Sequence, residues 1–117
     1  MNTIHEISSR LASLCEEQKF VEAYTELFAE DAVSIDPIYN NEPLTGLHNL
    51  IERERQFLAS TEIHDIKVSD ANFAGSYFSV TISMHFTVKG QESRAIEELC
   101  VYKVDKGKII SQQFFIG

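Results

Sequence analysis

The sequence has few of the residues that build metal, redox and phosphate sites. Its two cysteines, Cys15 and Cys100, form no C-x-x-C pair and have no metal-ligand spacing to any of the four histidines. We expect both to be small buried residues, and we predict no metal and no other cofactor. The chain also lacks a phosphate-binding glycine loop, a G-x-S-x-G motif and an H-E-x-x-H motif, so three common classes of enzyme site have no support.

Clustered basic residues and long apolar runs are missing as well. Ten Lys and Arg are scattered among eighteen Asp and Glu, and the formal net charge is -8. Nucleic acids and anionic membranes need a clustered positive surface, so we expect neither as a partner. The stretch MNTIHEISSRLASLCEEQ carries acids early and no uninterrupted apolar run. We therefore expect no signal peptide and no membrane span, and we predict a cytoplasmic protein.

What is present is typical of a globular domain. The chain is 44% apolar and 24% charged, which is ordinary for a globular protein. Its 117 residues are enough to bury a core and too few for two domains, so we predict a single domain over 1–117. Apolar residues at helical spacing predict two helices in the first thirty residues, the second of which carries Phe20, Tyr24, Leu27 and Phe28. A short strand over 32–36 and the loop PIYNNEPLTG should follow.

A third helix is predicted from Thr45 or Gly46 to about Ser60, with Glu54 interrupting its apolar stripe. The pattern then changes to period 2, which predicts long strands at about 62–73, 76–89, 92–104 and 107–116. The breaks AGS, KGQ and DKGK are short enough for hairpins, so these strands should form an antiparallel meander. Helices followed by strands indicate an α+β fold, with the helices on one face of a bent sheet.

Alternation along the strands indicates which side chains share a face. In the 76–89 strand, Phe78, Val80, Ile82, Met84, Phe86 and Val88 should face the helices, and His85 should face away. In the next strand the inward set is either Ile96, Glu98, Cys100 and Tyr102 or Glu97, Leu99, Val101 and Lys103. In the last strand it is either Gln112, Phe114 and Ile116 or Ile109, Ser111, Gln113 and Phe115. Because both faces are partly apolar, we predict a homodimer that buries the outer face of the sheet.

Three stretches carry a resemblance to a known family: FVEAYTELFAEDAVSIDP, EPLTGLHNLIERERQFL and YKVDKGKIISQQFF. With the order of the elements, they resemble the nuclear transport factor two-like superfamily, which includes ketosteroid isomerases and SnoaL-like polyketide cyclases. The resemblance implies a cystatin-like, cone-shaped α+β roll in which three N-terminal helices pack on a bent, mainly antiparallel sheet. It is weak evidence for activity, because this fold hosts isomerases, cyclases, dehydratases, hydrolases and binding modules.

The resemblance also implies a pocket and its residues. Asp36 falls where a ketosteroid isomerase keeps its general base, but Leu11 or Ala12 and Cys100 take the places of the oxyanion-hole donors. Oxyanion donors are usually the largest catalytic contribution, so steroid isomerase activity is not expected. The same register turns the following residues toward the pocket: Phe28, Glu54, Ile82, Met84, Phe86, Glu98, Cys100, Tyr102, Gln112, Phe114 and Ile116.

Each acid also has a simpler interpretation. Asp36 before proline can cap a turn, Glu54 can reach water or pair with Arg53 or Arg55, and Glu98 can lie at a solvated sheet edge. Two functional hypotheses follow from the pocket. The chain either binds a small hydrophobic or amphipathic molecule without changing it, or it catalyses proton transfer or water addition with Asp36 or Glu98 as the base.

Overall fold

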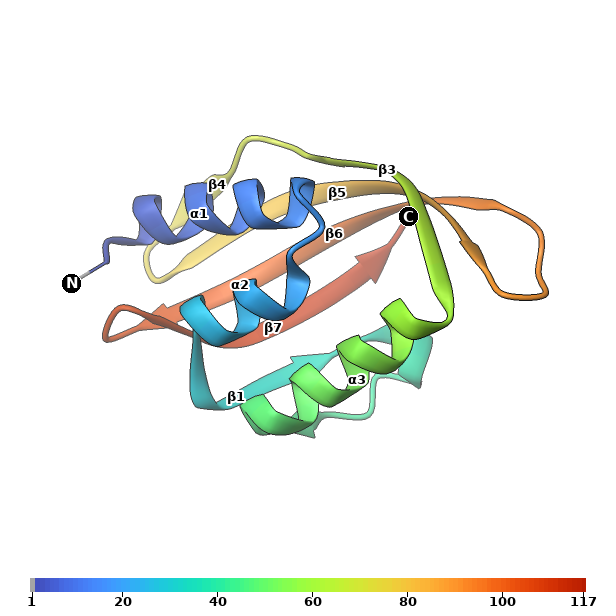
Figure 1. Ribbon diagram of the computed structural model, residues 1–117. Helices are drawn as coiled ribbons and strands as arrows, with labels where there is room; N and C mark the ends of the chain where they lie inside the picture. The colour runs from blue at the N-terminus through green and yellow to red at the C-terminus, as the bar shows by residue number, and fades with distance from the viewer. Residues whose placement is uncertain (1) are drawn as a thin grey trace.

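The computed structural model describes residues 2–117, and it has three helices on one face of a curved sheet (Figure 1). The helices are α1 (Ile4–Glu16), α2 (Phe20–Leu27) and α3 (Leu47–Ala59), and a 3-10 turn, η1, covers Pro37–Tyr39. The strands are β1 (Phe28–Ile35), β2 (Leu44–Thr45), β3 (Thr61–Val68), β4 (Asn72–Ala74), β5 (Tyr77–Val88), β6 (Arg94–Asp105) and β7 (Lys108–Ile116). The predicted cone-shaped α+β fold, with three helices on a mainly antiparallel sheet, is confirmed.

The sheet is mixed, in the order β2-β1-β7-β6-β5-β3, with β4 paired to β5. Strands β3, β5, β6 and β7 pair antiparallel, as the short hairpin breaks predicted. Strand β1 pairs parallel with β7, and this pair is the parallel part of the mainly antiparallel sheet. No hairpin joins β1 to β7, since most of the chain lies between them, and nothing local therefore dictates their relative direction.

Two predicted boundaries are wrong because tertiary pairing overrides the local pattern. Helix α2 ends at Leu27, and Phe28 already belongs to β1, where it pairs with Ile109 of β7. The strand expected over 62–73 is divided into β3 and β4. Between them the Ser69 backbone N–H donates to the Thr81 carbonyl oxygen (2.9 Å) and the Thr81 N–H donates to the Ser69 hydroxyl oxygen (2.8 Å). Strand β5 changes partner at this point.

The core lies between the helices and the inward face of β5, β6 and β7. Its most enclosed side chains include Ile7, Leu27, Phe78 and Ile109, each no more than 1% exposed. The strict alternation that turns Gln112 and Phe114 inward predicts that Ile109 faces outward. This prediction is wrong, because the β6–β7 register shifts after Lys103. A shifted register turns the residues beyond it to the opposite face, so Ile109 and Gln112 both point inward.

Among residues 2–117, no helix combines the length and the apolar character that crossing a bilayer requires.

Candidate functional site

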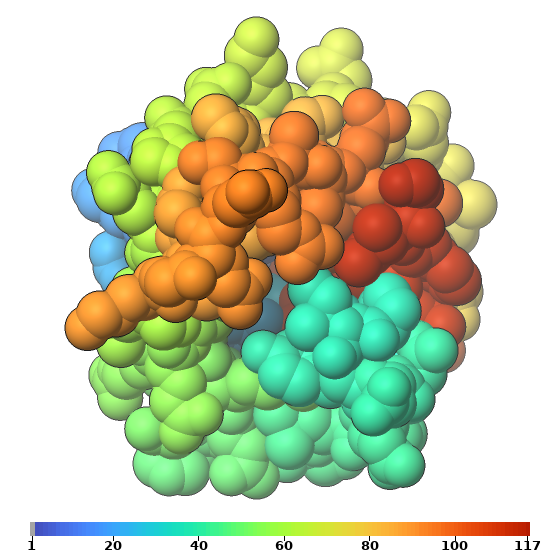
Figure 2. Space-filling model, turned by 90° about the vertical axis from the view of Figure 1, so that its right-hand side faces the viewer, coloured from blue at the N-terminus to red at the C-terminus, as the bar shows by residue number. Residues whose placement is uncertain are grey.

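A cavity of about 160 Å³ lies between the helices and the inward face of the sheet. Figure 2 shows a hollow at one end of the molecule, bordered by the β5–β6 hairpin in orange, the segment after β1 in cyan and the α3–β3 region in green. Lining side chains come from α1, α2, α3, β1, η1, the segments around them and strands β3, β5, β6 and β7. The cavity is therefore built from the whole length of the chain.

Most of the residues that the sequence assigned to the pocket lie in its lining: Phe28, Asp36, Glu54, Ile82, Met84, Phe86, Glu98, Tyr102, Gln112 and Phe114. Two do not. Cys100 faces the helices but is fully buried in the core opposite Val80, so its short side chain does not reach the cavity. Ile116 is 42% exposed, because β1 stops pairing with β7 at Gln113 and does not extend to cover it.

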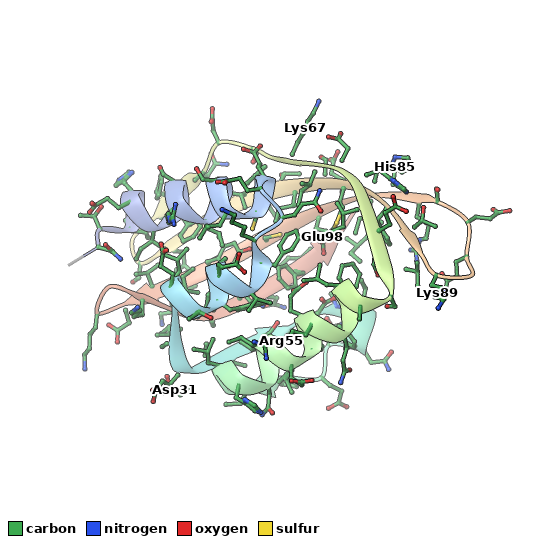
Figure 3. The ribbon with its side chains drawn as sticks, in the orientation of Figure 1. Asp31, Arg55, Lys67, His85, Lys89 and Glu98 are labelled. Atoms are coloured by element: carbon green, nitrogen blue, oxygen red, sulfur yellow. The ribbon has the colours of Figure 1, made fainter. Side chains whose placement is uncertain are left out.

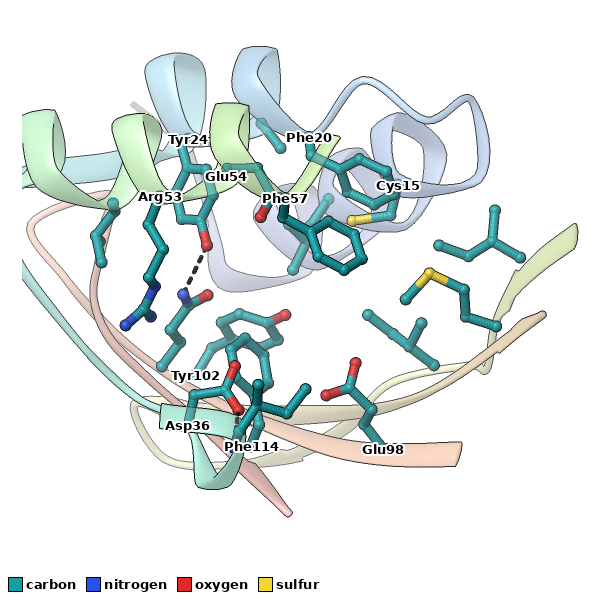
Figure 4. Close-up of a pocket in the computed structure, with 18 of the residues that line it drawn as sticks. Cys15, Phe20, Tyr24, Asp36, Arg53, Glu54, Phe57, Glu98, Tyr102 and Phe114 are labelled. Atoms are coloured by element: carbon teal, nitrogen blue, oxygen red, sulfur yellow. Dashed lines mark hydrogen bonds between the residues drawn. The ribbon is translucent and has the colours of Figure 1, made fainter. Parts of the chain in front are cut away.

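Asp36 fits both interpretations that the sequence left open, a cap of the turn and a residue of the pocket. Its carboxylate accepts a hydrogen bond from the Ile38 backbone N–H (2.9 Å) and so caps η1, as Asp before proline commonly does. The residue is nevertheless only 9% exposed and lines the cavity (Figure 4). The carboxylate is thus held in place by the turn while it borders the pocket.

Glu54 and Glu98 approach the cavity from opposite sides, one from α3 and one from β6 (Figure 4). Glu98 is only 9% exposed, and among residues 2–117 its carboxylate takes part in no hydrogen bond or ion pair. Figure 3 shows Glu98 in the interior between sheet and helices, whereas His85 projects from the outside, as the alternation predicted. The solvated-edge interpretation of Glu98 is therefore wrong.

Burial changes the acidity of both glutamates. It raises the pKa of Glu98 to about 7, and the charges of Asp36 and Glu54 add to this increase. Burial also raises the pKa of Glu54 to about 7. The positive charge of Arg53 lowers this pKa, and the negative charge of Asp36 raises it. Both carboxyl groups are consequently poised to gain or lose a proton near neutral pH.

A hydrogen-bonded chain of polar side chains joins several lining residues through the fully buried Ser34. Gln112 donates from its amide nitrogen to the Tyr24 hydroxyl (2.8 Å, dashed in Figure 4) and to the Ser34 hydroxyl (3.0 Å). Arg53 donates to the same Ser34 hydroxyl (3.1 Å) and lies 4.1 Å from the centre of the Tyr39 ring. Both amide hydrogens of Gln112 are used, so its carbonyl oxygen remains as an acceptor.

Arg53 does not neutralise the acids directly. In the part of the chain that the structure describes, no ion pair joins it to Glu54, and the pairing of Glu54 with Arg53 or Arg55 that we considered is absent. Burial raises the pKa of the Tyr24 phenol well above its ordinary value, so this hydroxyl stays protonated at neutral pH. It accepts from Gln112 and keeps its own proton for a further acceptor.

Sequence reasoning missed several lining residues, among them Tyr24, Tyr39, Arg53 and Phe57. Tyr24 was assigned to the apolar stripe of a helix, although a buried tyrosine hydroxyl needs a polar partner and could have signalled the network. Tyr39 lies in a loop whose conformation no periodicity predicts. The lining also contains Leu11, which the resemblance gave as one of two residues at an oxyanion-donor position. The other lining residues not anticipated are Cys15, Phe20, Ala23, Ile38, Leu50, Ile66 and Ile96.

Across residues 2–117, no three His, Cys, Asp or Glu side chains gather in a way that could hold a metal ion. The lining itself contributes three carboxyl groups, one guanidinium group, three phenols, one thiol and one amide to an otherwise apolar wall.

The sequence matches a known domain family, and the fold matches solved structures. The SnoaL-like domain matches residues 2–116. No protein of curated function matches the sequence. A crystal structure from Mesorhizobium loti, provisionally assigned as a SnoaL-like polyketide cyclase, superposes with a TM-score of 0.88 at 23% identity, over 97% of this chain and 99% of that one.

Two further crystal structures share the fold at lower identity. One is a hypothetical protein with a ketosteroid isomerase-like fold from Catenulispora acidiphila, in complex with trimethylamine (TM-score 0.79, 20% identity, 97% of this chain and 86% of that one). The other is a provisionally assigned polyketide cyclase from Pseudomonas putida (TM-score 0.78, 12% identity, 100% and 93%). These likenesses show the fold, and the family match covers nearly the whole chain. The protein belongs to the SnoaL-like domain family.

Proposed function

We propose that this protein binds a small, largely apolar molecule in the cavity between its helices and its sheet. The observation that carries the proposal is a cavity of about 160 Å³, open at one end and walled mainly by aromatic and aliphatic side chains, into which a few polar groups converge. Binding sites for small molecules commonly have this composition, with polar groups that fix orientation and an apolar wall that supplies affinity.

The size of the cavity limits the ligand. A dry cavity of about 150 Å³ holds a molecule as large as benzene, so ligands of roughly six to ten non-hydrogen atoms should fit here. A four-ring steroid is far larger. The apolar Leu11 in the lining and the absence of Cys100 from it further support a function other than steroid isomerisation. The Catenulispora acidiphila neighbour, in complex with trimethylamine, is consistent with a ligand of this small size.

The test is a screen of small aromatic and aliphatic compounds by thermal shift, followed by calorimetry on the compounds that stabilise the protein. Met84→Trp, on the inward face of β5, should fill the cavity and abolish binding. His85→Trp places the same side chain on the outer face of the same strand and should bind like the natural protein. Equal binding by both variants, or no stabilising compound at millimolar concentration, would refute the proposal.

A second candidate function is proton transfer or water addition of the isomerase, cyclase, dehydratase or hydrolase type, with Glu98 or Asp36 as the base. The observation that favours it is the pKa of Glu98, raised to about 7 by burial, because a general base works best when its pKa lies near the working pH. The Tyr24 hydroxyl could donate to a developing oxyanion.

Deuterium incorporation next to the carbonyl of small cyclic ketones, followed by NMR in heavy water, tests this candidate. The natural protein should accelerate exchange and Glu98→Gln should not. Acceleration that survives in both Glu98→Gln and Asp36→Asn would exclude these two residues as the base.

A further inference from the structure

We infer that the ligand of this cavity is a small organic cation, a protonated or quaternary amine whose positive charge lies among Asp36, Glu54 and Glu98. This inference rests on the proposed binding function and specifies the chemical class of the ligand. It is carried by the unpartnered Glu98 carboxylate, by the balance of charge in the lining and by the aromatic wall.

The Glu98 carboxylate is the first line of argument. It is more than nine-tenths buried, it projects into the cavity, and no donor or cation in residues 2–117 contacts it. A buried carboxylate without hydrogen bonds is costly, and native proteins keep such groups where something else satisfies them. A cation or an N–H donor from a bound molecule would do so.

The charge balance of the lining is the second line of argument. Three elements each contribute one carboxyl group: Asp36 follows β1, Glu54 lies on α3 and Glu98 lies on β6. The one guanidinium group in the lining, that of Arg53, is occupied with the Tyr39 ring and the Ser34 hydroxyl. An anionic ligand would meet an excess of negative charge, whereas a cation would complete the balance.

The aromatic wall of the cavity is the third line of argument. Rings from α2, β1, α3, β5 and β6 line the cavity, namely those of Tyr24, Phe28, Phe57, Phe86 and Tyr102. Ring faces attract cations, and an amine with apolar substituents gains from both the rings and the burial of its carbon atoms. The free carbonyl oxygen of Gln112 adds an acceptor for an N–H or O–H of the ligand.

A dependence on pH follows from the groups that face the cavity. These are Cys15 on α1, Tyr24 on α2, Asp36 and Tyr39 around η1, Arg53 and Glu54 on α3, and Glu98 and Tyr102 on β6. Of these, Glu54 and Glu98 have a pKa of about 7, and a bound cation would lower both pKa values. Binding should therefore release protons near neutral pH and strengthen as the pH rises through 7.

The experiment compares choline with 3,3-dimethylbutan-1-ol, which has the same shape but carries carbon in place of the charged nitrogen. Neither compound titrates, so any pH dependence belongs to the protein. Choline should bind about tenfold more tightly at pH 8, and this preference should fall about tenfold by pH 5.5. Calorimetry at pH 6.5 in two buffers of different ionisation enthalpy should show proton release with choline only.

Variants locate the charge. Glu98→Gln should weaken choline binding about tenfold and leave binding of the neutral alcohol unchanged. Glu54→Gln should have the same effect, and it replaces the first variant in the test if Glu98→Gln does not fold. The matched control is Glu97→Gln, which makes the same change at the neighbouring exposed residue on the other face of β6. It should bind both compounds like the natural protein.

The outcomes separate the two proposals. Equal binding of choline and the alcohol, or tighter binding of the alcohol at pH 8, overturns the cation inference and leaves a neutral-ligand pocket. Choline binding that Glu97→Gln weakens as much as Glu98→Gln also overturns it, because the effect would then be one of general surface charge. Binding of neither compound at millimolar concentration overturns the cation inference, while other ligands in the thermal-shift screen would still support the pocket.

Discussion

Strands β5 and β6 use their inward faces in two different ways along their length. In the first half of β5 and the second half of β6, the inward side chains Phe78, Val80 and Cys100 are at most 2% exposed, and Tyr102, which also borders the cavity, is 2% exposed. The rings of Phe78 and Tyr102 stack with centroids 4.9 Å apart. In the other halves, Ile82, Met84, Phe86, Ile96 and Glu98 line the cavity. One strand pair therefore contributes both to the packed core and to the wall of the cavity.

The difference shows that alternation fixes which side chains point inward but not what they meet there. In the packed region, side chains from facing elements fill the space at the density usual for protein interiors. In the cavity region, the side chains leave a space of about 160 Å³ between helices and sheet, and this is also where Glu54 and Glu98 lie. The predictions below test how far the two regions differ in energy.

The largest difference should appear when large apolar side chains are truncated. Phe78→Ala should lower the free energy of unfolding by about 3–5 kcal/mol, because it opens a void in a packed region. Met84→Ala should lower it by only about 1–2 kcal/mol, because this half-buried side chain already borders a cavity. Urea denaturation measures both values, and equal losses would contradict the distinction.

Glu98 should destabilise the fold at high pH. Its pKa is raised from 4.5 to about 7 in the folded chain, so its contribution to stability is greatest below pH 4.5 and is lost as the pH rises through 7. Glu98→Gln should therefore raise the free energy of unfolding at pH 8 by on the order of 2–3 kcal/mol and change it little at pH 4. Thermal melts across this range, with Glu97→Gln as the control, measure the effect. A stabilisation independent of pH would contradict the assignment.

The cap at Asp36 should have a smaller effect. Asp36→Ala removes the acceptor for the Ile38 N–H and should cost about 0.5–2 kcal/mol, whereas Asp36→Asn keeps an acceptor and should cost less. If the carboxylate also borders the ligand, both variants should weaken binding of a cation, while the alanine variant loses more stability than the asparagine variant. Thermal melts with choline titrations separate the two roles. Unchanged binding in both variants would leave Asp36 with its turn role alone.

The outer face should matter least for the stability of the subunit. Leu99 and Phe115 are 44% and 47% exposed and are paired across β6 and β7. Leu99→Lys and Phe115→Lys should each change subunit stability by no more than about 0.5 kcal/mol. If the proposed homodimer forms through this face, each should convert a dimer into a monomer in sedimentation velocity at micromolar concentration. A natural protein that is already monomeric would refute the dimer.

Much of the fold was predictable from local patterns. The change from period 3.6 to period 2 after residue 60 indicated the helices and the meander, and alternation in 76–89 identified the inward face of β5. The family resemblance selected the inward faces of β6 and β7 and brought Asp36, Glu98 and Gln112 into one lining. The helices, the meander and the inward face of β5 depend on periodicity, which the order of residues encodes directly.

Tertiary structure decided the rest. The parallel pairing of β1 with β7, the register shift that turns Ile109 inward and the exposure of Ile116 all depend on contacts between distant segments. So does the character of the site. A single carboxyl on a strand or helix is indistinguishable from a surface acid in the sequence. Only the packing of α3 and β6 around a shared cavity removes Glu54 and Glu98 from water and raises their pKa values, because desolvation is a property of the assembled surroundings rather than of the residue.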